Sequence, residues 1–231
     1  MICVSILAQD RRDGLQKMSK AFAVADVVEL RIDRMKAPDL PSLIGAKKGK
    51  LIVTNRRKEE GGFFKGNERE RVDLLKKAAA LGADFVDIEV KTARRLIDGL
   101  FAAVAANGGF TNVMVSHHDF RGTPSWKVLV GRLNACRALG ADMVKIVTYA
   151  NSVEDNLRLL QLIPEARGSG QKIVAFCMGP KGRVSRIVAP ILGSALSYTS
   201  LRKGAETAPG QLTVSEMREA LRFIGGGGPG S

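Results

Sequence analysis

Short runs of apolar, mostly β-branched residues recur along the chain at nearly regular intervals, and each has the length of a β-strand. Between the runs, apolar residues stand three or four positions apart, as on one face of a helix. Strand and helix patterns therefore alternate along the sequence. The eight predicted strands are Ile2–Leu7, Val27–Ile32, Leu51–Thr54, Phe85–Val90, Val113–His118, Met143–Thr148, Ile173–Phe176 and Ala195–Thr199. The helical series include Leu15, Met18 and Phe22; Val72, Leu75 and Ala79; Trp126, Leu129 and Leu133; and Leu157, Leu160 and Ile163.

The pentapeptide Ala-Leu-Gly-Ala-Asp occurs twice, at residues 80–84 and 138–142, and each copy joins a helical pattern to a strand. A glycine just past the last helical turn is a common helix end. Strands that are apolar on both faces indicate a parallel sheet covered by helices. Eight such units predict a (β/α)8 barrel, with a doubly wound open sheet as the alternative. We expect one domain over residues 1–224 and a glycine-rich tail at residues 225–231.

Composition narrows the class of protein. The 231 residues are 45% hydrophobic and 26% charged, which is typical of a folded globular protein. The cysteines Cys3, Cys136 and Cys177 lack the paired spacing of a zinc site or a disulfide framework, so we expect a reducing, cytoplasmic environment. The first apolar run is too short for a signal peptide, and no run approaches the roughly 20 residues that cross a bilayer. We therefore expect no membrane insertion.

The formal charge of +13 is compatible with either nucleic acid or an anionic small molecule as a partner. Basic residues are spread along the whole chain, and the nine Phe, two Tyr and one Trp form no stripe interleaved with them. A nucleic-acid-binding module is therefore the less favoured class. We expect a small anionic substrate and no nucleic acid.

Charged residues mark the ends of the second and third predicted strands, and active sites of (β/α)8 barrels form at the carboxyl ends of strands. Glu29, Arg31 and Asp33 share one face of the second strand, which indicates a paired cluster at the barrel mouth. The third strand continues into a charged loop that contains two glycines. In this loop Arg56 and Glu60 are placed to fold over a substrate, with a disordered surface loop as the alternative.

The only two histidines are adjacent, at the end of the fifth predicted strand. Alternation puts Val115 and His117 on one face of this strand and Ser116 and His118 on the other. The more apolar face should pack on helices, so His118 should face the barrel mouth. A histidine there suits acid–base chemistry near neutral pH, and a purely structural histidine is the alternative.

Lys145 lies in the middle of the apolar sixth strand, where an unpaired ammonium costs on the order of several kcal/mol to desolvate. A buried lysine escapes that cost by losing its proton, and the neutral amine attacks a carbonyl to form a Schiff base. The alternative is a structural ion pair with a buried carboxylate. Glu89 on the fourth strand is the candidate partner.

Two segments after the seventh and eighth strands are predicted to bind substrate. The first, residues 178–186, opens a helix and contains Arg183 and Arg186, which is typical of an anion clamp. Alternation does not choose between these two arginines. The second, Thr207–Gln211, is a turn with hydroxyl and amide groups, for which a plain turn is the alternative.

Six of these segments, in this order along the chain, resemble those of the type I 3-dehydroquinate dehydratases, and the resemblance spans nearly the whole sequence. The six segments are Glu29–Asp33, Arg56–Gly62, Ser116–Phe120, Val144–Ile146, Met178–Arg186 and Ala208–Gln211. The resemblance implies a (β/α)8 barrel and a hydro-lyase of the shikimate pathway of aromatic amino-acid biosynthesis. It also implies a homodimer that needs no metal or cofactor.

The resemblance further implies a role for each candidate residue. Lys145 would be the Schiff-base lysine, His118 the general acid and base, and Glu60 the carboxylate that pairs with this histidine. Arg186, rather than Arg183, would bind the substrate carboxylate. The other substrate contacts that the resemblance implies are Ser5, Glu29, Arg31, Arg56, Thr207 and Gln211.

Two residues depart from the family pattern. His117 stands where the family more often has an aromatic residue, which leaves a second histidine within reach of the site, and Thr207 stands where it usually has serine. Neither change removes chemistry that the reaction requires. The alternative enzyme class is a class I aldolase or transaldolase, which also uses a barrel lysine. A glycine-rich phosphate cradle after the seventh and eighth strands would favour that class.

Overall fold

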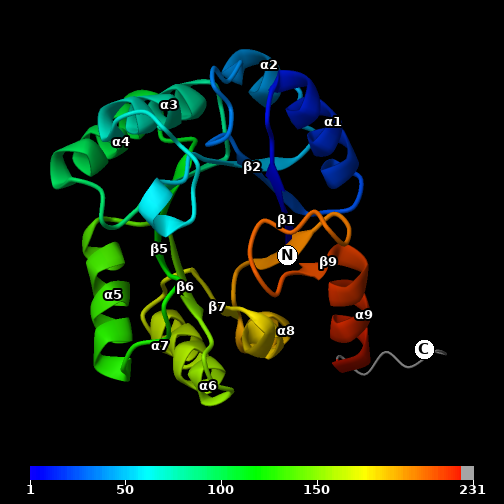
Figure 1. Ribbon diagram of the computed structural model, residues 1–231. Helices are drawn as coiled ribbons and strands as arrows, with labels where there is room; N and C mark the ends of the chain where they lie inside the picture. The colour runs from blue at the N-terminus through cyan, green and yellow to red at the C-terminus, as the bar shows by residue number, and fades with distance from the viewer. Residues whose placement is uncertain (225–231) are drawn as a thin grey trace.

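The computed structural model describes residues 1–224 and shows parallel strands that alternate with helices and curl into an α/β barrel (Figure 1). The glycine-rich tail predicted at residues 225–231 lies outside the described residues. The strands are β1 (Ile2–Leu7), β2 (Val27–Arg31), β3 (Lys50–Thr54), β4 (Phe85–Glu89), β5 (Asn112–Asp119), β6 (Met143–Tyr149), β7 (Ile173–Met178), β8 (Ser197–Ser200) and β9 (Leu212–Thr213). The helices are α1 (Arg11–Phe22), α2 (Leu40–Gly45), α3 (Glu68–Ala80), α4 (Arg94–Ala106), α5 (Trp126–Ala138), α6 (Glu154–Leu160), α7 (Leu162–Gly168), α8 (Arg183–Leu192) and α9 (Val214–Ile224), with 3₁₀ turns η1 (Lys58–Glu60) and η2 (Pro180–Gly182).

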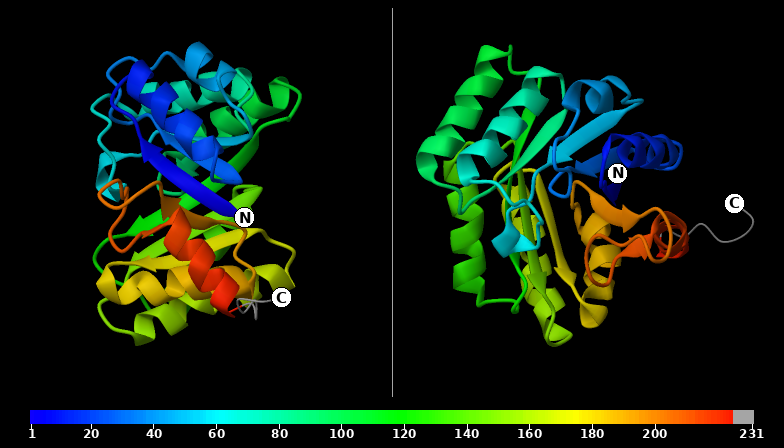
Figure 2. Two further views of the ribbon diagram at one scale, coloured as in Figure 1. Left: turned by 90° about the vertical axis from the view of Figure 1, so that its right-hand side faces the viewer. Right: turned by 45° about the horizontal axis from the view of Figure 1, so that its top comes forward.

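The strand order identifies the barrel. Each strand from β2 to β7 lies next to its predecessor, and β8 returns to pair with β1, where Cys3 is opposite Tyr198. All of these pairs are parallel, and the helices cover the outer side of the strands (Figure 2). The sheet is curled and its helices cover one side only, whereas a doubly wound sheet has helices on both faces, so the arrangement confirms the predicted barrel.

Successive residues of each strand point to opposite sides of the sheet, which divides the apolar core in two. Outward-facing residues such as Val28 and Val115 belong to a large outer cluster together with helical residues such as Leu75. Inward-facing residues such as Val27 and Met114 form a smaller cluster inside the barrel. Other inward positions, nearer the carboxyl ends, are polar although they are buried. These positions include Ser5, Glu29, Asp87, Ser116 and Lys145.

The helical series predicted from Leu157 to Ile163 is divided between α6 and α7, and Leu157 is exposed. Pro164 supplies the physical reason, because it has no N–H to donate to the carbonyl of Leu160, where α6 ends. Strand β9 was not predicted, since two residues carry no periodic signal. Within residues 1–224, no helix combines the length and the apolar character needed to span a membrane.

Two glycines, one inside α5 and one just after it, give opposite predictions for the free energy of unfolding. Gly131 lies exposed inside α5 with no atom within 4 Å of an added Cβ, whereas Gly140 follows the helix with φ of +83°. Gly131→Ala should raise the free energy of unfolding by about 0.5–1 kcal/mol, because alanine loses less backbone entropy on folding. Gly140→Ala should lower it by about 1 kcal/mol, because Cβ is strained at positive φ. Urea denaturation of both variants measures the difference, and equal effects would contradict this assignment of the helix end.

Candidate active site

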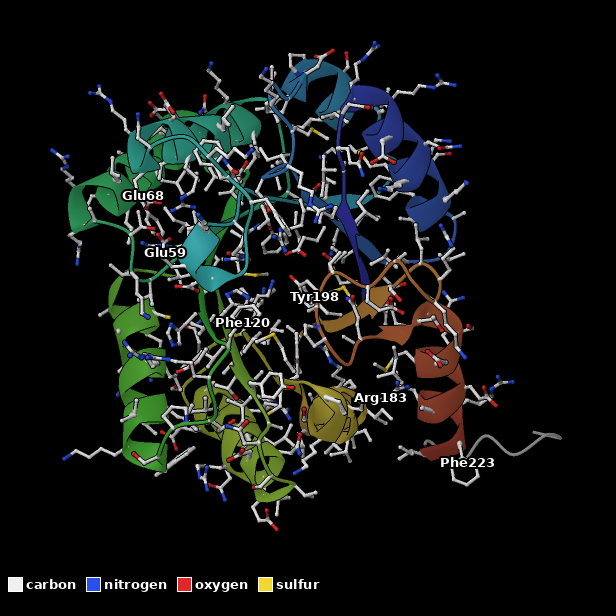
Figure 3. The ribbon with its side chains drawn as sticks, viewed as in Figure 1. Glu59, Glu68, Phe120, Arg183, Tyr198 and Phe223 are labelled. Carbon is white, nitrogen blue, oxygen red and sulfur yellow. The ribbon has the colours of Figure 1, made fainter. Side chains whose placement is uncertain are left out.

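A pocket opens at the carboxyl ends of the strands, and nine of the ten candidate residues line it. Ser5 is the exception, because it is buried behind Glu29 and its hydroxyl donates a hydrogen bond to that carboxylate. Phe120 and Tyr198, labelled in Figure 3, belong to the same pocket. The lining residues are Glu29, Arg31, Arg56, Glu60, Gly61, His118, Phe120, Lys145, Val147, Phe176, Met178, Arg186, Tyr198, Thr207, Ala208 and Gln211.

Lys145 reaches the pocket from β6 and is 4% exposed. Its Nζ lies 3.1 Å from Oε1 of Glu29 and 3.3 Å from Oδ2 of Asp87. The ring of Tyr198 covers another side of the ammonium, with its centroid 4.1 Å from Nζ. The buried cation is therefore surrounded by two carboxylates and one aromatic face.

Glu89, which the sequence suggested as the ion-pair partner of Lys145, is not in contact with it. The two oxygens of Glu89 are taken by other cations: Arg56 Nη1 lies 2.7 Å from Oε1, and Arg71 Nη1 lies 2.7 Å from Oε2. Asp87, two residues earlier on the same face of β4, takes the position beside Lys145. The expectation of a lysine–carboxylate pair thus had the right strand and the wrong residue.

Arg56 joins these carboxylates into one network. It is 2% exposed, and Nη2 donates to Asp87 at 2.6 Å while Nη1 also donates to the hydroxyl of Ser116 at 2.7 Å. Burial alone would raise the pKa of Asp87, but Arg56 and Lys145 outweigh it and hold this pKa well below its usual range. Burial likewise opposes ionisation of Glu29, and Lys145 more than compensates, so the pKa of Glu29 is also lowered.

Arg31 and Asp33 form a second ion pair at the mouth, as the shared face of β2 predicted. Arg31 Nε and Nη2 donate to the two oxygens of Asp33 at 2.6 and 2.8 Å. The pair also holds the loop after β3, because Arg31 Nη2 donates to the carbonyl of Gly61 and the N–H of Phe63 donates to Asp33. The loop is therefore docked on the mouth instead of being a disordered surface loop, and its Glu60 is buried.

Glu60 meets His118 at this docked loop. Oε2 of Glu60 accepts the backbone N–H of His118 at 2.8 Å and lies 3.1 Å from its Nδ1, which leaves Nε2 to face the pocket. Burial raises the pKa of Glu60 to about 7. Burial, together with Arg56 and Lys145, lowers the pKa of His118 well below its usual value, so this imidazole is a neutral base near pH 7.

His117 points away from the pocket, as alternation along β5 predicted for the two histidines. It is 3% exposed on the outer side of the barrel, and burial lowers its pKa to about 4. The second histidine that the family comparison placed within reach is therefore not part of this site.

Arg186 enters the pocket from α8 with unused hydrogen-bond donors. Nη2 donates to the carbonyl of Pro209 at 3.0 Å, whereas Nε and Nη1 are buried without a partner. The guanidinium lies over the ring of Phe176, 4.3 Å from its centroid, and burial lowers its pKa to about 9. Arg183 is exposed and 3.9 Å from Glu216, so the structure distinguishes the two arginines that the sequence left open. A buried guanidinium with unpaired donors has the geometry to receive a planar anion such as a carboxylate.

Thr207 and Gln211 lie on the loop that follows β8. The side chain of Gln211 accepts the backbone N–H of Thr207 at 2.9 Å, and both residues line the pocket beside Arg186. This loop docks on the loop after β7 through a hydrogen bond from the N–H of Gly179 to the carbonyl of Pro209. The turn is thus part of the pocket wall.

Sequence reasoning missed two residues that contact Lys145. Asp87 has a visible signal, because Asp87 and Glu89 share one face of an apolar strand in the same way as Glu29 and Arg31. Tyr198 has none, since an uncharged aromatic residue in a strand is an ordinary core residue. Its place over Nζ follows only from how the sheet curls to bring β8 opposite β6.

Ionisable side chains gathered at the carboxyl ends of barrel strands define an enzyme of the α/β-barrel class. The profile of the type I 3-dehydroquinase family matches residues 2–227. The chain therefore belongs to this family, and the resemblance inferred from the sequence is confirmed. The predicted enzyme class, a hydro-lyase of the 3-dehydroquinate dehydratase type, is confirmed with it.

Curated relatives of the same family are similar to this chain over nearly its full length. A 3-dehydroquinate dehydratase of Thermococcus gammatolerans is 38% identical over 226 residues, covering 98% of this chain and all of that protein. One from Pyrococcus abyssi is 36% identical over 227 residues with the same coverage. Neither relative is an aldolase, and the aldolase alternative is not supported.

Solved structures of the family have the same fold. The enzyme of Geobacillus kaustophilus superposes with a TM-score of 0.89 at 26% identity, covering 97% of this chain and 90% of that one. The enzyme of Clostridium difficile, crystallised with covalently modified comenic acid, gives 0.85 at 26% identity, with coverage of 96% and 91%. A 3-hexulose-6-phosphate synthase, at 18% identity and a TM-score of 0.59, shares the fold alone.

The unpaired donors of Arg186 predict that a variant without them is more stable but no longer binds a carboxylate. Arg186→Met should raise the free energy of unfolding of the unliganded protein by about 1–3 kcal/mol, because it removes a buried charge without a counterion. The native protein should gain thermal stability from excess cyclohexanecarboxylate, and the variant should gain none. Arg183→Met, at the surface, should change neither quantity. A variant that is less stable and still responds to the carboxylate would contradict the anion site.

The raised pKa of Glu60 predicts that ionisation of this residue lowers the free energy of unfolding as the pH rises. An acid whose pKa rises on folding favours the folded state below its unfolded pKa of 4.5, and this advantage is lost as the pH rises to about 7. Glu60→Gln removes the ionisation. The free energy of unfolding of the variant, relative to the native protein, should therefore increase by up to about 3 kcal/mol between pH 4 and pH 8. Urea denaturation at both pH values measures it, with exposed Glu59→Gln as the control that shows no such gain. An equal difference at the two pH values would contradict the raised pKa.

Proposed function

We propose that this protein dehydrates 3-dehydroquinate to 3-dehydroshikimate through a Schiff base on Lys145. The observation that carries the proposal is the place of Nζ inside the pocket, between Glu29 and Asp87. Family membership supports the reaction, and the chemistry of a buried amine beside a histidine supports the mechanism.

Substrate binding is assigned to the cationic side of the pocket. The two unpaired donors of Arg186 bind the substrate carboxylate and fix its orientation. Arg31, Arg56, Thr207 and Gln211 supply polar contacts for its hydroxyl groups. Ser5 contributes through Glu29, which it holds by a hydrogen bond.

The reaction then uses one lysine and one histidine. Nζ bonds to the ketone carbon and gives up two protons, which pass to the carbonyl oxygen, so this oxygen leaves as water and an iminium results. The iminium accepts electrons, so His118 removes a proton from the adjacent carbon and a neutral enamine results. The enamine expels the hydroxyl of the next carbon, which takes the proton from His118 and leaves as water. A second water molecule hydrolyses the new iminium, which restores the amine, and the sum of all steps is the loss of one water.

Glu60 supports His118 in both of its roles. Its Oε2 faces Nδ1 at 3.1 Å, which orients the ring with Nε2 toward the substrate. When Nε2 takes a proton, the nearby carboxyl group stabilises the imidazolium. Catalysis by His118 is expected to depend on Glu60 for this reason.

Reduction by borohydride tests the covalent step. Incubation with 3-dehydroquinate and borohydride should add the mass of the reduced ligand to the intact protein, and peptide mapping should place it on Lys145. Lys145→Met should abolish both the adduct and the ultraviolet absorbance of the enone product. If the native protein formed product without any adduct, the Schiff-base mechanism would be contradicted, while the proposed dehydration would still stand.

The adjacent histidines provide matched controls in the same experiment. His118→Asn should still form the adduct on Lys145, while kcat falls by about 10²–10⁴-fold because proton transfer is lost. His117→Asn should retain both adduct and turnover, since its side chain lies outside the pocket. A greater loss of turnover in His117→Asn than in His118→Asn would reverse the assignment.

The family resemblance also supports a place for this reaction in the shikimate pathway of aromatic amino-acid biosynthesis. It supports a homodimer as the working form. A cytoplasmic location agrees with the three buried cysteines, all of which are free thiols.

A further inference from the structure

We infer that Phe120 is a positioning residue that holds Glu60 against His118 by packing on Gly61. The inference rests on the proposed function, because it concerns the efficiency of His118. Phe120 belongs to the loop after β5, two residues beyond His118, and Gly61 directly follows Glu60. His118 and Phe120 therefore come from one segment, and the residues that they contact, Glu60 and Gly61, come from the loop after β3.

The ring of Phe120 packs closely against Gly61. A Cβ placed on Gly61 would lie 2.5 Å from Cζ of the ring and 3.0 Å from Cε2, so the ring sits directly on the glycine backbone. Gly61 has φ of +80°, which also requires glycine. Phe120 lies beside η1 and the end of β5 in Figure 3. Its contact is thus a second junction between the two segments that carry the histidine–glutamate pair.

The exposure of Phe120 agrees with this role. Phe120 is 42% exposed at the rim of the pocket, so it is not a core residue, and the part that is covered includes its contact with Gly61. The same loop is also held by polar contacts, from Arg31 to the carbonyl of Gly61 and from the N–H of Phe63 to Asp33. The turn that carries Glu60 is therefore held by both an ion pair and an aromatic ring.

Removal of the ring has a defined consequence for Glu60. Without Phe120 the turn gains freedom, the distance between Glu60 and Nδ1 of His118 is no longer fixed, and water reaches the carboxyl group. Burial is the main cause of the raised pKa of Glu60, so access of water lowers it. The charged groups that act on Glu60 from the neighbouring elements are Arg56, Glu89 and Lys91, and His118 adds the hydrogen bond of its backbone N–H. The replacement of Phe120 removes none of these groups.

A double-mutant cycle of Phe120→Ala and Glu60→Gln tests the inference. If Phe120 acts through Glu60, each single variant lowers kcat for 3-dehydroquinate by roughly 10-fold or more, and the double variant is no slower than Glu60→Gln alone. Phe120→Tyr, which restores the ring, should recover most of the rate. The pH profile of kcat in Phe120→Ala should lose the ionisation near pH 7 that Glu60 contributes, and this ionisation should move to lower pH.

Phe63→Ala is the matched control, since Phe63 is 44% exposed on the same loop but stacks on Arg34 and not on Gly61. It should change kcat by less than about twofold. Multiplicative losses in the double variant would overturn the inference and indicate that Phe120 contacts the substrate directly. If Glu60→Gln alone leaves kcat unchanged, the proposed role of Glu60 fails instead. The two failures are therefore distinguishable, and thermal unfolding of each variant shows that it is folded.

Discussion

The site depends on the burial of a lysine inside a barrel, and the surrounding charges follow from the need to compensate it. Removing the ammonium of Lys145 from water is costly unless opposite charges replace the solvent. Glu29 and Asp87 do so, and Asp87 in turn needs Arg56. Arg56 also contacts Glu89, whose second oxygen meets Arg71 on α3. Charges of alternating sign therefore run from Nζ of Lys145 on β6 through β4 and the loop after β3 to α3, and they fix those elements together.

Arg186, in contrast to Lys145 and Arg56, is a buried cation without an opposite charge beside it within residues 1–224. It is as deeply buried as Arg56, yet two of its donor nitrogens have no partner, and Pro209 provides its one hydrogen bond. A folded protein without ligand bears this cost, and an anion that enters the pocket removes it. The pocket thus combines a side whose charges are paired, around Lys145, with a side whose charge is unpaired, at Arg186. In the proposed function, the unpaired side binds the substrate anion, and this affinity is gained at the expense of stability at Arg186.

Sequence patterns predicted the features that depend on local periodicity. Alternation along a strand gave the shared face of Glu29 and Arg31 and the inward face of His118, because side chains two residues apart share a face whatever the fold around them. It gave no information on neighbours across the barrel. The partner of Lys145 was therefore assigned to Glu89, although Arg56 and Arg71 occupy that carboxylate. Contacts of this kind depend on barrel curvature and on side-chain length.

The positive charge of the pocket also decides the state of the histidine. Burial, with Arg56 and Lys145 nearby, keeps His118 neutral, so it is ready to accept a proton when the pocket contains no ligand. In the proposed reaction the bound carboxylate adds negative charge beside these cations and raises the pKa of His118. The histidine then holds more firmly the proton that it takes from the substrate. In the proposed reaction, the same cations that attract the anion also keep the base neutral, so binding and proton transfer are linked through one set of charges.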